Sequence, residues 1–337
     1  MGSLPISRYF VVEMEFWDRL SELESLYRFW KATTKGKFNF IVISGRRGVG
    51  KTRLIFEFAS RYDVKNMVYL FVEKKEMPSL ITGFIKRLER VVGRKLPKVS
   101  TIEDFLLLLL ELSRETPILV VFDEFQNFNF VDKSSFYKFQ EVIDRAKFQG
   151  NVKLMIIVIG SLIGMMRNIM ENEQAPLYGR KTGEIWVKPF EFWQIRSMLK
   201  KFGVKDEREI VEIYSILGGM PRYYDSIDRA DLKFSLNDVI KFFIDKSYPG
   251  WKEVRGELIE EFRDAHPTYF SILEAIASGN VTAHEISSVS GIQMKSIYKY
   301  LSELENFFGI IEKRIPIIGS AQRPARYYMK AFLRFLV

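Results

Sequence analysis

A short glycine-rich run near the start of the chain carries the residues with the clearest chemistry. Residues 44–52 read SGRRGVGKT, which fits the pattern G-x-x-x-x-G-K-S/T and directly follows the apolar stretch 38–43. Such glycines let successive backbone N–H groups curve around phosphate oxygens at the positive end of a following helix. We expect Lys51 to reach the β- and γ-phosphates of a nucleoside triphosphate, and Thr52 to ligate Mg²⁺. The other predicted phosphate-binding residues are Gly45, Arg46, Arg47, Gly48, Val49 and Gly50.

Two acids at the end of a second apolar run could complete a hydrolytic site. The run ILVVF at 118–122 is followed by Asp123 and Glu124. Hydrolysis needs one group that holds the metal and another that orients the attacking water. We assign Asp123 to Mg²⁺ through water and Glu124 to the attacking water. Acids that merely cap a strand in solvent are the alternative, which the upstream phosphate loop makes the weaker one.

A third polar residue follows the next apolar run. Ser161 comes after Gly160 at the end of the stretch 154–159. Its hydroxyl is predicted to bond the γ-phosphate or the attacking water, although a serine here could equally cap a helix N-terminus.

These residues require a scaffold that brings strand ends together. Short apolar, β-branched runs alternate with amphipathic stretches, which predicts an α/β fold, a P-loop NTPase with a parallel sheet covered by helices on both faces. Strands are predicted near 38–44, 67–72, 117–122, 153–159 and 184–187. Apolar positions 16, 20, 23 and 26 predict a helix that packs on this sheet and walls the adenine pocket.

The pattern changes twice after residue 190. Helices are predicted near 191–202, 206–216, 221–229 and 235–246, which suggests a small helical lid. Helices at 267–278, 282–288 and 293–307 precede extended segments at 310–316 and 326–329, the order of a winged helix-turn-helix. The predicted domains are therefore a P-loop ATPase core at 1–190, a helical lid at 191–265 and a winged helix-turn-helix domain at 266–337.

Together these motifs resemble the archaeal ATPase family, P-loop proteins of the AAA+/STAND type related to the origin-recognition ATPases. The resemblance spans nearly the whole chain. It rests on the order and spacing of Arg19, Glu22, Leu23, the phosphate loop, Asp123-Glu124-Phe125-Gln126, Gly160-Ser161, residues 175–180 (APLYGR), Lys188-Pro189-Phe190 and residues 218–223 (GGMPRY).

The resemblance implies roles for four further residues. Arg180 is a candidate arginine finger, acting either in cis or on a neighbouring subunit, and a solvated loop arginine is the alternative. Pro221 matches the lid motif near the base and Arg222 could be a second phosphate sensor, although Gly-Gly-x-Pro can simply separate two helices. Arg19 is included among the nucleotide-binding residues.

The resemblance also bears on Gln126 and on nuclease activity. Gln126 could couple the γ-phosphate to a partner surface or merely cap a loop. Many family members carry a C-terminal nuclease-like domain, but we find no acidic cluster for one and expect no nuclease activity.

The C-terminal residues suggest a nucleic-acid partner. In the predicted recognition helix, Ile297, Leu301 and Leu304 should face the core, while polar side chains point outward towards double-stranded DNA. The predicted DNA contacts are Lys295, Ser296 and Lys299 on that helix, with Gln293 exposed beside them, and Lys313, Arg314, Arg323 and Arg326 on a basic wing that continues to Lys330 and Arg334. Winged helices also dock proteins, so this alternative stays open.

Composition limits the remaining possibilities. The 337 residues carry a net charge of +9, which favours an acidic partner, and they include no Cys and only two His, so any metal should have oxygen ligands. No signal-peptide pattern is present, and we expect a cytoplasmic protein. The primary hypothesis is an ATPase that uses ATP and Mg²⁺ and whose nucleotide state controls DNA binding or assembly. The alternative is a slow nucleotide-dependent switch that docks a protein partner or a second copy of itself.

Overall fold

The computed structural model describes residues 16–245, 248, 250–315 and 324–329. The chain divides into two compact units, with Asp18–Lys188 in one unit and Pro189–Val337 in the other. None of the helices in the described part of the chain combines the length and the apolarity that crossing a bilayer requires.

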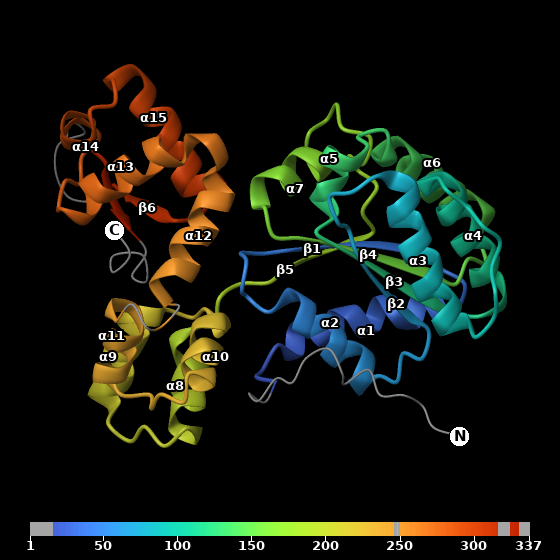
Figure 1. Cartoon of the computed structure of the whole chain (residues 1–337), viewed down its shortest axis with the longest axis horizontal. Coiled ribbons are helices and arrows are strands. Elements are labelled where there is room, and N and C mark those ends of the chain that lie inside the picture. Colours follow the sequence, from blue (N-terminus) through green and yellow to red (C-terminus); the bar gives the residue numbers. More distant parts are fainter. Residues whose placement is uncertain (1–15, 246–247, 249, 316–323, 330–337) are drawn as a thin grey trace. The chain divides into compact units, whose positions relative to one another are not determined.

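A five-stranded parallel sheet forms the centre of the first unit (Figure 1). Its strands are β1 (Asn39–Ser44), β2 (Met67–Phe71), β3 (Ile118–Asp123), β4 (Leu154–Gly160) and β5 (Gly183–Trp186), in the order β2-β3-β4-β1-β5. Every residue of β1, β3 and β4 is buried, because helices cover both faces and select continuous apolar runs. The predicted α/β fold is confirmed, and each strand lies within one residue of its predicted bounds.

The two faces of the sheet are covered by different helices (Figure 1). Helices α1 (Leu20–Thr34) and α2 (Lys51–Arg61) lie on one face. The other face shares a core with α3 (Met77–Val92), α4 (Ile102–Glu115), α5 (Phe128–Val131), α6 (Ser135–Gln149) and α7 (Ile163–Met170). The centre of that core is a phenylalanine cluster, which consists of Phe84, Phe105, Phe122, Phe125, Phe128, Phe136 and Phe139.

The first helix differs from its prediction at both ends. A helix was expected over 16–26, but α1 begins at Leu20 and continues to Thr34. Asp18 and Arg19 have φ values of 52° and 74°, in the left-handed region, so the helix cannot extend back through them. The apolar spacing at 16–26 therefore gave the wrong start.

The second unit begins with helices that surround their own small core. They are α8 (Phe192–Lys201), α9 (Glu207–Leu217), α10 (Pro221–Arg229), α11 (Leu236–Ile244) and α12 (Gly250–Phe262). The first four lie within two residues of their predicted bounds, whereas α12 was not predicted.

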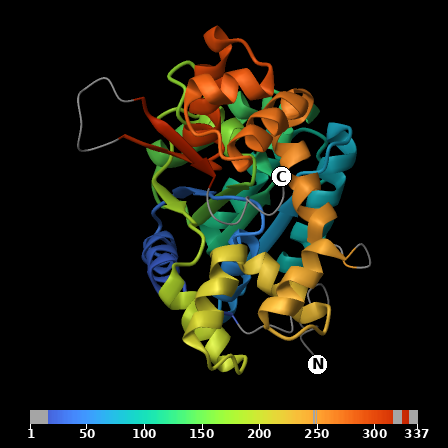
Figure 2. The ribbon, with the colours of Figure 1, turned by 90° about the vertical axis from the view of Figure 1, so that its left-hand side faces the viewer.

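Three helices and a hairpin complete the second unit. They are α13 (His266–Ala277), α14 (Ala283–Ser290), α15 (Met294–Ser302), β6 (Ile311–Arg314) and β7 (Arg326–Met329). Figure 2 shows β6 and β7 as an antiparallel pair of red strands beside the orange helices. The predicted third helix is shorter than 293–307, since α15 gives way to a π-helical turn at Glu303–Phe307. Helices and strands occur in the predicted order, and the winged-helix assignment itself stays a prediction.

Candidate active site

The phosphate loop joins the carboxyl end of β1 to the first turn of α2. Gly45 has φ 154°, and a Cβ there would lie 2.4 Å from the carbonyl oxygen of Val187. Gly50 adopts φ 95° immediately before Lys51, the first residue of α2. Both positions therefore need glycine, and the loop ends at a helix N-terminus, where free N–H groups favour an anion.

Lys51 lies inside the curve of this loop. Its ammonium group donates to the carbonyl oxygens of Gly45 at 2.7 Å and Arg46 at 3.0 Å. The residue is only 7% exposed, so the loop carbonyls solvate the charge in place of water. Phosphate oxygens brought into the loop would offer this ammonium stronger, charged acceptors.

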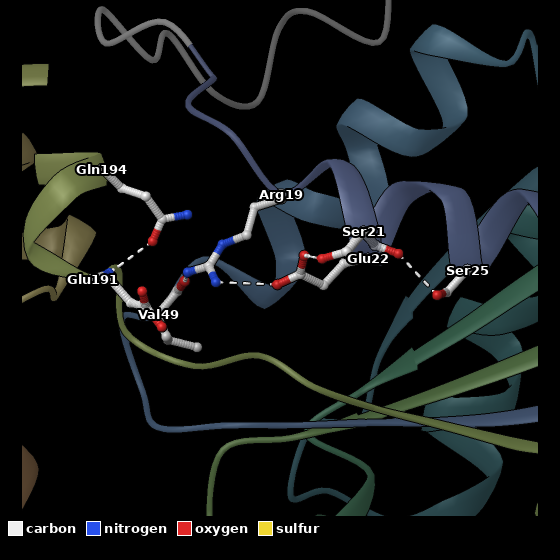
Figure 3. Close-up of polar contacts among 7 residues, drawn as sticks. All are labelled: Arg19, Ser21, Glu22, Ser25, Val49, Glu191 and Gln194. Carbon is white, nitrogen blue, oxygen red and sulfur yellow. Dashed lines mark hydrogen bonds and ion pairs between the residues drawn. The ribbon is translucent and has the colours of Figure 1, made fainter. Parts of the chain in front are cut away.

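Arg19 supports the phosphate loop from the N-terminal side. Its guanidinium donates to the carbonyl oxygen of Val49 at 3.2 Å and to a carboxylate oxygen of Glu22 at 3.2 Å (Figure 3). Burial lowers the pKa of Arg19, and the charge of Glu22 opposes this effect. The structure thus places Arg19 on the backbone of the loop, while a direct contact with nucleotide stays a prediction.

Removal of this guanidinium should weaken the first unit. Arg19→Met removes the guanidinium that donates to the Val49 carbonyl and leaves the Glu22 carboxylate with the Ser21 hydroxyl as its donor, so we expect a loss of about 1.5–3 kcal/mol in unfolding free energy. Urea denaturation followed by circular dichroism measures it. Arg28→Met is the control, because Arg28 bonds Ser25 in an exposed position on α1, the helix that follows Arg19. If Arg19→Met and Arg28→Met unfolded at the same urea concentration, the guanidinium of Arg19 would not stabilise the first unit.

Thr52 and Asp123 meet beside the phosphate loop, as the sequence predicted for a metal site. The Thr52 hydroxyl donates to Oδ2 of Asp123 at 2.8 Å, and Asp123 is 6% exposed. A hydroxyl and a carboxylate are hard oxygen donors of the kind that Mg²⁺ prefers. Among the described residues no three His, Cys, Asp or Glu side chains gather as a metal cluster.

Glu124 follows directly and is held by polar side chains. The Ser161 hydroxyl donates to its two carboxylate oxygens at 2.7 and 2.9 Å, and the Gln126 amide also donates to the carboxylate. Ser161 does not cap α7, whose N-cap residue is Leu162. Glu124 adopts φ 54°, and a left-handed residue other than glycine marks local strain of the kind found at functional sites.

Backbone and side-chain hydrogen bonds link these groups into one site. The backbone N–H of Glu124 donates to Oδ1 of Asp123 at 2.8 Å, so a continuous chain of contacts runs from Thr52 through Asp123 and Glu124 to Ser161. All four residues lie at the carboxyl edge of the sheet, where parallel α/β proteins bind their ligands.

Comparison with known proteins decides the family. A sequence model of an ATPase domain found predominantly in Archaea matches residues 16–226. The chain belongs to this archaeal ATPase family. The matched residues include the whole site described above, and the resemblance noted from the motifs is confirmed.

Individual relatives extend over more of the chain. The uncharacterized protein MJECL04 of Methanocaldococcus jannaschii is 29% identical over 317 residues, which are 94% of this chain and 66% of that protein. The chain therefore spans about two thirds of the length of that relative.

Solved structures share the fold at low sequence identity. The Walker-type ATPase PABY2304 of Pyrococcus abyssi has a TM-score of 0.69 at 21% identity, with 96% of both chains covered. The ORC2 protein of Aeropyrum pernix, solved as ADPNP–ADP complexes, has a TM-score of 0.63 at 15% identity, with 96% of this chain and 93% of that chain covered. These matches confirm the P-loop ATPase fold.

Arg180 lies at the opposite edge of the sheet from the phosphate loop. The N–H of Thr182 donates to Phe40 near the start of β1, so Arg180 precedes β5 at the amino edge. Its guanidinium bonds Asp144 of α6 at 3.1 and 3.2 Å. β1 has six residues that rise ~3.3 Å each. The phosphate loop follows the far end of β1 and therefore lies about 20 Å from Arg180. The arginine-finger role of Arg180 stays a prediction, and this separation favours action on a neighbouring subunit over action in cis.

Pro221 and Arg222 belong to the second unit. Gly218 ends α9 and Pro221 is the first residue of α10, so this segment does separate two helices, as the alternative interpretation required. Gly219 packs against Phe190, whose carbonyl oxygen would lie 1.7 Å from a Cβ. Nucleotide contacts of Pro221 and Arg222 stay predictions.

The predicted DNA contacts that the structure describes are accessible. Lys295 and Lys299 are exposed on α15 and Ser296 is half-buried, while Ile297, Leu301 and Leu304 are buried as expected. Lys313, Arg314 and Arg326 are exposed on the hairpin. Arg323, Lys330 and Arg334 lie outside the described residues.

Sequence reasoning missed one residue of the site and left another undecided. Tyr69 of β2 donates its hydroxyl to Asp123. Gln126 is 1% exposed and bonds Glu124, so it does not simply cap a surface loop. Alternation along β2 could have placed Tyr69 on the α2 face, but its contact with Asp123 depends on the register of β2 and β3, which the sequence does not state.

Proposed function

We propose that this chain is a Mg²⁺-dependent ATPase whose nucleotide state controls DNA binding through its C-terminal helices and hairpin. The observation that carries the proposal is the convergence of Lys51, Thr52, Asp123, Glu124 and Ser161 beside one phosphate loop.

Each group has a part in the hydrolysis. The loop N–H groups and Lys51 hold the triphosphate, and Glu124 orients a water and accepts its proton. The water oxygen bonds to the γ-phosphorus while the bond to the β–γ bridging oxygen breaks, and ADP and phosphate are released. The Ser161 hydroxyl donates to Glu124 and would help to orient its carboxylate towards that water. Mg²⁺ bound at Thr52 and Asp123 would neutralise charge on the β- and γ-phosphate oxygens.

The hairpin supports the DNA part of the proposal. Arg314 of β6 is paired directly with Arg326 of β7, and both are exposed, while Arg314 also forms an ion pair with Glu312. Exposed cations on a hairpin of this kind suit contacts with DNA phosphates. Lys313 lies beside this pair, and exposed Lys295 and Lys299 on α15 add positive charge to the same unit.

A test of the proposal combines ATP hydrolysis with DNA binding. Wild-type protein should hydrolyse ATP with Mg²⁺ and lose this activity with EDTA, and duplex DNA should change the rate. Neutralising Lys313 and Arg314 together should lower the slope of log affinity against log salt by about 1–2, since each lost phosphate contact contributes about 0.9. The control replaces Lys205 and Arg208, which removes the same charge from another exposed part of the unit.

One observation favours a second candidate function, the docking of a protein. Met294 and Tyr298 are 38% and 55% exposed one turn apart on α15, and apolar side chains of this kind suit a protein interface. ATP binding without turnover, together with no response to DNA, would favour a nucleotide-dependent switch that docks a protein through α15.

A further inference from the structure

Tyr69 occupies a defined place between β2 and α2. Val68 and Leu70 point into the core on the far face of the sheet, so alternation directs Tyr69 towards α2. There its ring packs against Phe56, with ring centroids 5.2 Å apart. Phe56 lies four residues after Thr52, and residues four apart share one face of a helix. One face of α2 therefore brings Thr52 to the Asp123 carboxylate and Phe56 to the Tyr69 ring.

The Tyr69 hydroxyl completes the set of donors around Asp123. It donates to Oδ2, the same oxygen that accepts from Thr52 at 2.8 Å, while Oδ1 accepts from the Glu124 N–H. A phenol is protonated at neutral pH, so its hydroxyl donates here and the carboxylate accepts.

We propose that Tyr69 is a positioning residue, whose hydroxyl holds the Asp123 carboxylate in the orientation that metal-dependent nucleotide binding requires. Three donors hold the two carboxylate oxygens, and without Tyr69 only the Thr52 hydroxyl and the Glu124 N–H would resist rotation about the last side-chain bond, whose torsional preference is broad. Side chains that hydrogen-bond a metal ligand orient that ligand, and their removal lowers metal affinity by about 10–100-fold. The inference deepens the proposed function and rests on it.

The test compares ATP binding in the presence of Mg²⁺ with ATP binding in its absence. We would titrate ATP into wild type and Tyr69→Phe by calorimetry, once with Mg²⁺ and once with EDTA. Tyr69→Phe keeps the ring on Phe56, so affinity in EDTA should stay within about twofold, whereas the gain from Mg²⁺ should fall by about 10-fold or more. Tyr62→Phe is the control, because Tyr62 packs on Tyr27 and Phe58 at the far end of α2.

Other outcomes would overturn the inference in distinguishable ways. An unchanged gain from Mg²⁺ in Tyr69→Phe would show that Asp123 is oriented without the phenol, and the proposed function would stand. Equal losses of ATP affinity with Mg²⁺ and with EDTA would assign Tyr69 to packing alone. Wild-type protein that gains no affinity from Mg²⁺ would overturn both the inference and the metal dependence of the proposed function.

Discussion

Replacement of Glu124 with glutamine should lower ATP turnover by about 10²–10⁴-fold, the range for loss of a general base. Glutamine has the same length and keeps one oxygen to accept from Ser161, but it cannot take a proton from water. ATP affinity should change by no more than about twofold, because the substitution leaves Lys51 and the phosphate loop intact. Phosphate release and calorimetric titration of ATP measure the two quantities.

A matched substitution controls for the loss of charge. Glu103→Gln removes a carboxylate that forms an ion pair with Lys138 on the surface, and it should hydrolyse ATP at the wild-type rate. Turnover in Glu124→Gln equal to wild type would place the base elsewhere. A loss of ATP binding together with turnover would show that Glu124 supports the loop instead of the water.

The largest effect on stability should come from Phe122→Ala. Phe122 is fully buried, and its ring contacts five other members of the phenylalanine cluster, with the nearest centroid, that of Phe139, at 5.1 Å. Truncation removes buried apolar area and leaves a cavity, so we expect a loss of about 3–5 kcal/mol in unfolding free energy. Urea denaturation measures the change.

The chain offers a control of identical chemistry. Phe148 is 94% exposed at the end of α6, and Phe148→Ala should alter stability by less than about 0.5 kcal/mol. If both variants unfold at the same urea concentration, the cluster around Phe122 does not stabilise the unit. Because Phe122 immediately precedes Asp123, Phe122→Ala should also lower ATP affinity in the presence of Mg²⁺.

The sheet could be predicted well because its signals are local. Buried parallel strands appear as continuous apolar runs, and the phosphate-loop pattern fixes where one strand ends and a helix begins. Lys51, Thr52, Asp123, Glu124 and Ser161 follow from these runs, since parallel strands end at a common edge.

What the sequence concealed depends on contacts between distant segments. The start of α1 is set by left-handed backbone at Asp18 and Arg19, which apolar spacing does not register. The Tyr69 contact follows from cross-strand register and from the Phe56 ring. The position of Arg180 at the amino edge became evident only with the pairing of β1 and β5.

The strand order has a consequence for how the site is built during synthesis. β1 is made first, but its neighbours are β4 and β5, so Asn39 has no strand partner until Met155 has been added. Pairings of such long range are slow to form, because the intervening chain must be closed into a loop first. The phosphate loop at the end of β1 is therefore synthesised early, but it can take up its folded conformation only after β4 has been synthesised. Nascent chains that end before β4 contain the glycine-rich segment, but the β1 strand that precedes it has no partner strand. Such chains should be unable to bind ATP.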